Sequence, residues 1–171
     1  MSELLGADSL IAKCRKLASK QAGDDIVRRA VLNACKNVVQ ADAKLRAPAN
    51  GGELRKRIRV RVKMEGDRVV GEVYTNLKYA PYVEFGTGPI GQANHLGISP
   101  EVSVTYKSNP WFVHEDQIDV GHYHFQKIGE FYKMYGQPAQ PYLYPALKDN
   151  QERVSKNISN YVRRKIREQI R

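Results

Sequence analysis

A histidine pair is the feature of the sequence closest to a metal site. His122 and His124 are two residues apart, so on a strand both would lie on the same side, as metal ligands must. His114, Glu115 and Asp116 lie nearby in the sequence and carry further donor atoms. These residues follow no fixed ligand spacing. We therefore interpret the pair as two surface histidines and predict neither a metal nor another cofactor.

Motifs for catalysis are missing from the sequence. It has no Gly-x-Ser-x-Gly, no His-Glu-x-x-His, no Walker loop and no dinucleotide fingerprint. Gly86-Thr87-Gly88 is short and precedes a loop, whereas a phosphate site favours a helix N-terminus. The carboxylates do not cluster as a two-metal nuclease requires. We predict that the protein is not an enzyme.

The segment Tyr79–Gly88 is the most distinctive stretch, because it combines aromatic residues, a carboxylate and two glycines. Pro81 biases Ala80 toward extended geometry, and the glycines permit backbone angles that other residues resist. We expect a strand end that turns sharply and presents three aromatic side chains. These side chains either fill the core or form a contact surface.

Length and composition indicate a folded, basic protein. The chain has 171 residues, 42% of them hydrophobic, and a formal net charge of +10. This size favours a single domain over residues 1–171. No apolar run is long enough to span a bilayer, so we expect a soluble protein made and used in a cytoplasm, with no membrane partner. The charge suits contact with nucleic acid or with an acidic protein surface.

Apolar residues at three- and four-residue steps predict helices in both halves of the chain. A short first helix should end at Ala22-Gly23, and a long one should run from an Asp24 cap to Ala47-Pro48. A second long helix should begin at Pro145 and continue to the end of the chain. Cys14 and Cys35 fall in the helical patterns, and we predict that both are buried free thiols.

Alternation of apolar and polar residues predicts strands between the helices. Leu54–Met64 and Val69–Asn76 should form an antiparallel hairpin across Glu65-Gly66-Asp67. The outer face of the first strand is basic, with Arg57, Arg59, Arg61 and Lys63. That face is either a solvated surface or a surface that faces DNA or an acidic partner.

The middle of the chain predicts a long loop and more strands. Residues 89–110 should form a loop, with a short strand at Val102–Tyr106. Trp111–Val113 and Tyr123–Lys127 should pair as a second hairpin. The fold class is therefore α+β, with an antiparallel sheet of about four strands packed against the long N-terminal-half helix and the long C-terminal helix.

Several motifs together resemble a known family. They are Leu5-Gly6 followed by Leu10, Ala47-Pro48 followed by Gly52-x-Leu54, Tyr79–Gly88, and Gly136–Leu147. From about Leu5 to Arg167 the chain resembles the tail-component family of tailed bacteriophages, typified by a head–tail joining protein of a lambda-like siphophage. Gly51 and Gln140 depart from the family's usual residues, and residues 90–125 match only loosely.

The resemblance implies a small α+β subunit of the virion neck or tail. Such proteins assemble as rings around the channel through which DNA leaves the head, next to the connector and tail proteins. The resemblance therefore implies a homo-oligomeric ring in the particle, and it is compatible with a monomer in solution.

We hypothesise that residues of the two most specific motifs shape the subunit contact or its supporting turn. They are Tyr79, Tyr82, Glu84, Phe85, Gly86, Thr87, Gly88, Pro138 and Pro141. The competing interpretation is that these residues only maintain the fold. An alternative function is a nucleic-acid-binding module that uses the face from Arg57 to Lys63 and the C-terminal helix.

Overall fold

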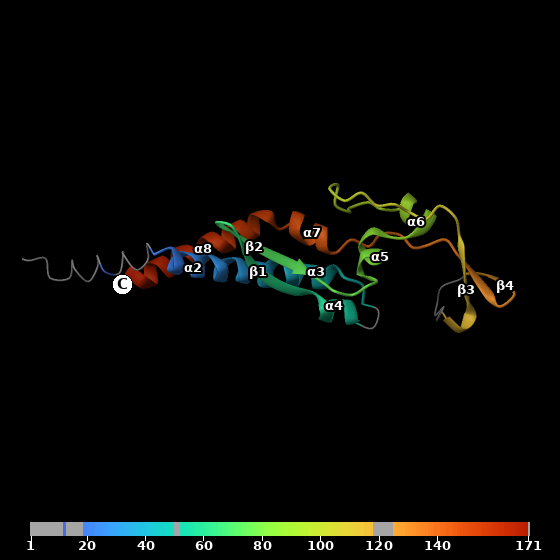
Figure 1. Cartoon of the computed structure of the whole chain (residues 1–171), viewed down its shortest axis with the longest axis horizontal. Helices are drawn as coiled ribbons and strands as arrows, with labels where there is room; N and C mark the ends of the chain where they lie inside the picture. Colours follow the sequence, from blue (N-terminus) through green and yellow to red (C-terminus); the bar gives the residue numbers. More distant parts are fainter. Residues whose placement is uncertain (1–11, 13–18, 50–51, 118–124, 171) are drawn as a thin grey trace, which may run out of the picture. The chain divides into compact units, whose positions relative to one another are not determined.

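The computed structural model describes residues 12, 19–49, 52–117 and 125–170 and has the predicted α+β class. Long helices lie in both halves of the chain, as expected (Figure 1). The described strands form two separate antiparallel sheets, of two and three strands, where one sheet of about four strands was predicted.

The chain divides into two compact units. Unit 1 comprises residues 1–45, 58–74 and 146–171, and unit 2 comprises residues 46–57 and 75–145. Each unit is described by itself below. That the whole chain forms one domain stays a prediction.

A continuous helical segment forms the centre of unit 1. It consists of α2 (Lys20–Ala34), the π-helical η1 (Cys35–Gln40) and α3 (Ala41–Arg46). Ser19 caps α2, because its hydroxyl accepts a hydrogen bond from the Ala22 N–H at 3.4 Å. The predicted break at Ala22-Gly23 and the cap at Asp24 are therefore wrong, since the helix starts earlier and continues through Gly23.

The predicted hairpin is confirmed, with a later start. β1 (Arg59–Glu65) pairs with β2 (Arg68–Tyr74), and Glu65 lies opposite Arg68 across the turn. The preceding residues instead form α4 (Glu53–Arg57) in unit 2. Ion pairs from Glu53 to Lys56 and Arg57, one helical turn away, favour this helix over the strand that alternation predicted.

The hairpin packs closely on the helical segment. A Cβ at Gly71 would lie only 2.5 Å from the sulfur of Cys35 and 2.6 Å from a methyl of Val31. Glycine at this position therefore lets the backbone of β2 approach the helix. Cys35 is a buried free thiol, as predicted, and burial raises its pKa. Cys14 lies outside the described residues.

The C-terminal helical region packs against α2 and is interrupted once. It begins at Leu143, earlier than the predicted Pro145, as α7 (Leu143–Lys148), and continues as α8 (Gln151–Ile170). At the interruption, the buried Asn150 amide donates to Asp42 at 2.7 Å and to the Ala146 carbonyl at 3.0 Å. These contacts fix Asn150 at the interruption, where one continuous helix was predicted.

Unit 2 is built of short elements. Besides α4, they are α5 (Ala80–Phe85), α6 (Gly88–Ala93), β3 (Trp111–His114), η3 (Glu115–Gln117), β4 (Gln126–Ile128) and β5 (Phe131–Met134). The strand order β3-β5-β4 shows that β3 pairs with β5. The predicted pairing of Trp111–Val113 with Tyr123–Lys127 is therefore wrong.

The predicted strand end at Tyr79–Gly88 is also wrong, because α5 and the start of α6 occupy this segment. Pro81 lies in the first turn of α5, where its missing N–H costs no helical hydrogen bond. The predicted loop begins with α6, and Val102–Tyr106 is not a strand.

Candidate functional site: the junction of two motifs

Two motifs that are about fifty residues apart in the sequence meet in unit 2. We call the contact between Tyr79–Gly88 and Gly136–Tyr144 the motif junction. The backbones of Thr87 and Gln137 exchange hydrogen bonds of 2.9 and 3.1 Å, and the Gln140 N–H donates to the Val83 carbonyl at 2.8 Å. The side-chain amide of Gln137 also donates to the Tyr82 carbonyl at 2.9 Å. Hydrogen bonds to backbone groups therefore join the two motifs into one local structure.

Glu84 is the buried centre of the junction, with only 4% of its surface exposed. One carboxylate oxygen accepts from the backbone N–H groups of Tyr142 and Leu143, at 2.8 and 3.0 Å. The other accepts from the N–H of Tyr144 at 2.9 Å. These groups lie at the start of α7, where backbone donors have no helical partner and negative charge is favoured. The carboxylate therefore fastens α5 to the start of α7.

Gly136 permits the close approach of the two backbones. Its φ is +94°, and a Cβ there would lie 1.8 Å from the Thr87 carbonyl oxygen. A larger residue would force the two segments apart, so this close approach requires glycine at position 136.

Tyr142 lies beside Glu84 and is fully buried. Among the described residues its hydroxyl has no hydrogen-bond partner. Burial raises the pKa of this phenol, and the negative charge of Glu84 raises it further. The ring therefore contributes packing, while its hydroxyl contributes no hydrogen bond that the structure describes.

The predicted contact residues divide into buried and accessible sets. Glu84, Gly86 and Gly88 are buried; Phe85, Thr87 and Pro141 are half-buried; Tyr79, Tyr82 and Pro138 are exposed. The carbonyl of Phe85 accepts from the Tyr106 hydroxyl at 2.8 Å. The junction is thus a fixed support that carries exposed tyrosines on its surface.

The predicted basic face is only partly assembled, and its charge is partly compensated. Arg59, Arg61 and Lys63 lie on the exposed face of β1, whereas Arg57 belongs to α4. Glu72 of β2 pairs with Arg61, and with Lys63 at 2.6 Å. Lys63 and Arg61 together lower the pKa of Glu72, so this carboxylate stays charged at neutral pH.

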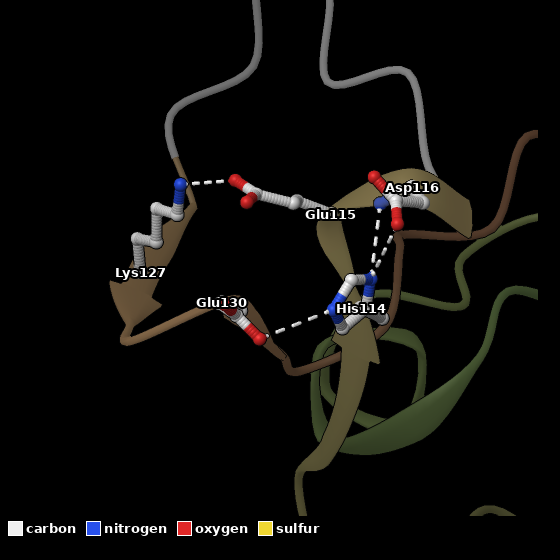
Figure 2. Close-up of polar contacts among 5 residues, drawn as sticks. All are labelled: His114, Glu115, Asp116, Lys127 and Glu130. Carbon is white, nitrogen blue, oxygen red and sulfur yellow. Dashed lines mark hydrogen bonds and ion pairs between the residues drawn. The ribbon is translucent and has the colours of Figure 1, made fainter.

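Polar side chains gather around His114, in the region where the sequence offers donor atoms for a metal but predicts no metal site. Figure 2 shows His114 between Asp116 and Glu130, at 3.2 and 3.5 Å, beside a pair formed by Glu115 and Lys127. The ammonium of Lys127 lowers the pKa of Glu115. No group of three or more metal-binding side chains occurs in the part of the chain that the structure describes. His122 and His124 lie outside that part.

Gln137 and Tyr142 are among the junction residues that were not predicted from the sequence as site residues. Both lie in the Gly136–Leu147 motif, and that motif is the only signal that could have identified them. Their contacts with α5 depend on long-range packing, which the local pattern does not encode.

Comparison with known proteins confirms the resemblance over the first half of the chain. Residues 8–86 match the model of the HK97-gp10-like family, described as "Bacteriophage HK97-gp10, putative tail-component". The matched range includes α2, the hairpin and α5 with Glu84. Neither the curated proteins nor the solved structures contain a significant match. None of the helices that the structure describes is both long and apolar enough to cross a membrane.

Proposed function

We propose, from the match to a family of bacteriophage tail components, that this protein is a structural protein of the phage neck or tail. It joins head and tail, or completes the tail, by assembling as a homo-oligomeric ring around the DNA channel. Its neighbours in the particle are connector and tail proteins. The match over residues 8–86 is the observation that carries this proposal.

The motif junction supports a contact role in such a ring. A closed ring repeats one heterologous interface, so each subunit needs a rigid surface with a defined shape. Glu84 and the backbone bonds between Thr87 and Gln137 fix the junction, and Tyr79 and Tyr82 are 43% and 58% exposed beside it. Tyrosine provides a large contact area at low entropic cost, and it is enriched at protein interfaces.

The three-stranded sheet supports a protein partner for unit 2. Its strand register places Phe112, Phe131 and Ile128 on one face, and these side chains are 55%, 44% and 49% exposed. The opposite face, with Trp111 and Val113, is half-buried. A cluster of exposed apolar side chains is common where proteins meet in an assembly.

A stand-alone nucleic-acid-binding module is the alternative function. Its predicted surface combines the face from Arg57 to Lys63 with the C-terminal helix, yet Glu72 and Glu65 pair with cations on the β1 part of that surface. The compensated charge on β1 counts against a module that uses both parts and favours the assembly role.

Complementation tests the proposal. A phage or prophage that lacks the gene is supplied with the wild-type chain, with the Tyr79→Ser/Tyr82→Ser double variant, or with Lys78→Ser as a control at an exposed neighbouring position. We expect the tyrosine variant to fold with an unchanged Tm but to yield few infectious particles, while the control behaves like the wild type. Normal particle yields from the tyrosine variant would contradict the contact role of these residues.

A further inference from the structure

We infer that one face of α8 binds the phosphate backbone of double-stranded DNA. Six exposed residues occur along this helix at steps of three and four, so they form one continuous stripe. They are Arg153, Lys156, Asn160, Arg163, Arg164 and Arg167. At 1.5 Å per residue the stripe is about 21 Å long. All six side chains carry N–H groups that can donate hydrogen bonds, as contacts with phosphate oxygens require.

The positive charge of this stripe is less compensated than that of β1. Among the described residues, no carboxylate lies within ion-pair distance of Arg163 or Arg167. Lys156 pairs with Glu152 at 3.6 Å and Arg164 with Glu168 at 3.8 Å, and both carboxylates are at least half exposed. Such surface pairs are weak and exchange readily for other anions.

The end of the stripe surrounds a hollow in the surface. Asn160, Arg163, Arg164, Arg167 and Glu168 line it. Four of these five residues donate hydrogen bonds and three are cationic. Glu168 stays anionic and opposes anion binding, because Lys165 lowers the pKa of its carboxylate, but the ion pair with Lys165 compensates part of that charge. The hollow therefore presents clustered guanidinium groups to a phosphate group.

The distribution of charge over the chain agrees with this location. Unit 1 contains 20 of the 28 Lys and Arg residues but 11 of the 18 Asp and Glu residues, so it carries nearly all of the net charge of +10. A long-range attraction for a polyanion is therefore directed to the unit that contains α8.

Burial of the other face of α8 favours DNA over a membrane surface as the partner of this helix. Val154, Ile158 and Val162 are half-buried, and α8 packs against α2. An amphipathic helix that binds lipid needs its apolar face free to enter the bilayer. Among other polyanions, we infer DNA because the proposed function puts the protein at a DNA channel. To that extent the inference rests on that function.

The test measures binding of the full chain to a labelled 30-base-pair duplex at several salt concentrations. Arg163→Gln/Arg167→Gln is compared with Arg59→Gln/Lys63→Gln, which removes the same charge from β1. Both variants should keep the wild-type Tm, because they change exposed residues. We expect the α8 variant to bind more weakly and its slope of log affinity against log salt to fall by about 1.8, the value for two lost phosphate contacts.

Three outcomes would overturn the inference. One is no binding of the duplex by the wild-type chain. Another is an equal loss in both variants, which would reflect only net charge. The third is equal competition: poly-glutamate or vesicles of anionic lipid would displace the labelled duplex as effectively as unlabelled duplex does at the same concentration of charge. These outcomes are independent of the proposed function, which would fail if a phage that lacks the gene still formed intact, infectious particles.

Discussion

At the scale of residues, Glu84 shows how a motif residue can be structural. Its carboxylate accepts three backbone hydrogen bonds at a buried site, and the three donors are 58, 59 and 60 residues away in the sequence. The sequence identified Glu84 as part of a specific motif, but it left open whether the residue forms a contact or supports a turn. The structure favours support, because the side chain is not accessible to a neighbouring subunit.

Replacing Glu84 should therefore destabilise the protein before any effect on assembly. We expect Glu84→Ala to lower the free energy of unfolding by about 3 kcal/mol, because buried backbone donors lose a charged acceptor. Glu84→Gln should lose less, since its amide oxygen still accepts. Urea denaturation measures both. Wild-type stability of Glu84→Ala would contradict the supporting role.

Tyr142 gives a prediction of the opposite sign. Because its hydroxyl has no partner among the described residues, Tyr142→Phe should leave stability at pH 7 unchanged or raise it by up to about 1 kcal/mol. The measurement is chemical denaturation of both proteins at pH 7. A loss above about 1 kcal/mol would show that the hydroxyl has a partner.

The same residue should make stability sensitive to alkali. Its pKa is raised in the folded protein, so the unfolded chain loses the proton first and stability falls as pH rises above the ordinary value of 10.0. The slope for one such group approaches about 1.4 kcal/mol per pH unit. Denaturation between pH 8 and about 11 should therefore show a shallower decline for Tyr142→Phe, and identical curves would contradict burial of the phenol.

At the scale of elements, substitution of two glycines by alanine should change the free energy of unfolding in opposite directions. Gly71→Ala places a Cβ against Cys35 and Val31, so we expect a loss of about 2 kcal/mol. Gly23→Ala lies inside α2 with no atom within 4 Å of the new Cβ, so we expect a gain of about 0.5–1 kcal/mol.

A double-mutant cycle provides the control for this contact. Cys35→Ala should cost less in the Gly71→Ala background than in the wild type, because it opens space for the new methyl group. Thermal or urea unfolding of the four proteins measures this coupling. Additive effects would mean that the approach of β2 to η1 is not as close as described.

The elements that were predicted correctly are those with long periodic patterns. The helices around Val31 and Ile158 and the hairpin from Arg59 to Tyr74 each bury one face, so their periodicity is visible in the sequence. The elements of unit 2 are short, and contacts between distant residues such as Thr87 and Gln137 determine them. Pro81 illustrates the ambiguity, because proline fits both an extended segment and the first turn of a helix.

At the scale of the whole molecule, the two units suit different partners. Unit 2 carries exposed tyrosines and a sheet face with exposed Phe112, Phe131 and Ile128, and it is nearly neutral. Unit 1 carries the basic stripe of α8. We therefore propose that unit 2 makes the protein contacts in the particle and that unit 1 contacts DNA. The fold class and the family resemblance were apparent from the sequence, whereas this division required the structure.

The most direct test of the assembly role is electron microscopy of a lysate from a phage or prophage that lacks this gene. The proposal predicts filled heads and separate tails, which accumulate because the joint is missing. Heads without any tails would instead assign the protein to tail building. Intact, infectious particles would contradict the claim that the protein is a structural component of the neck or tail.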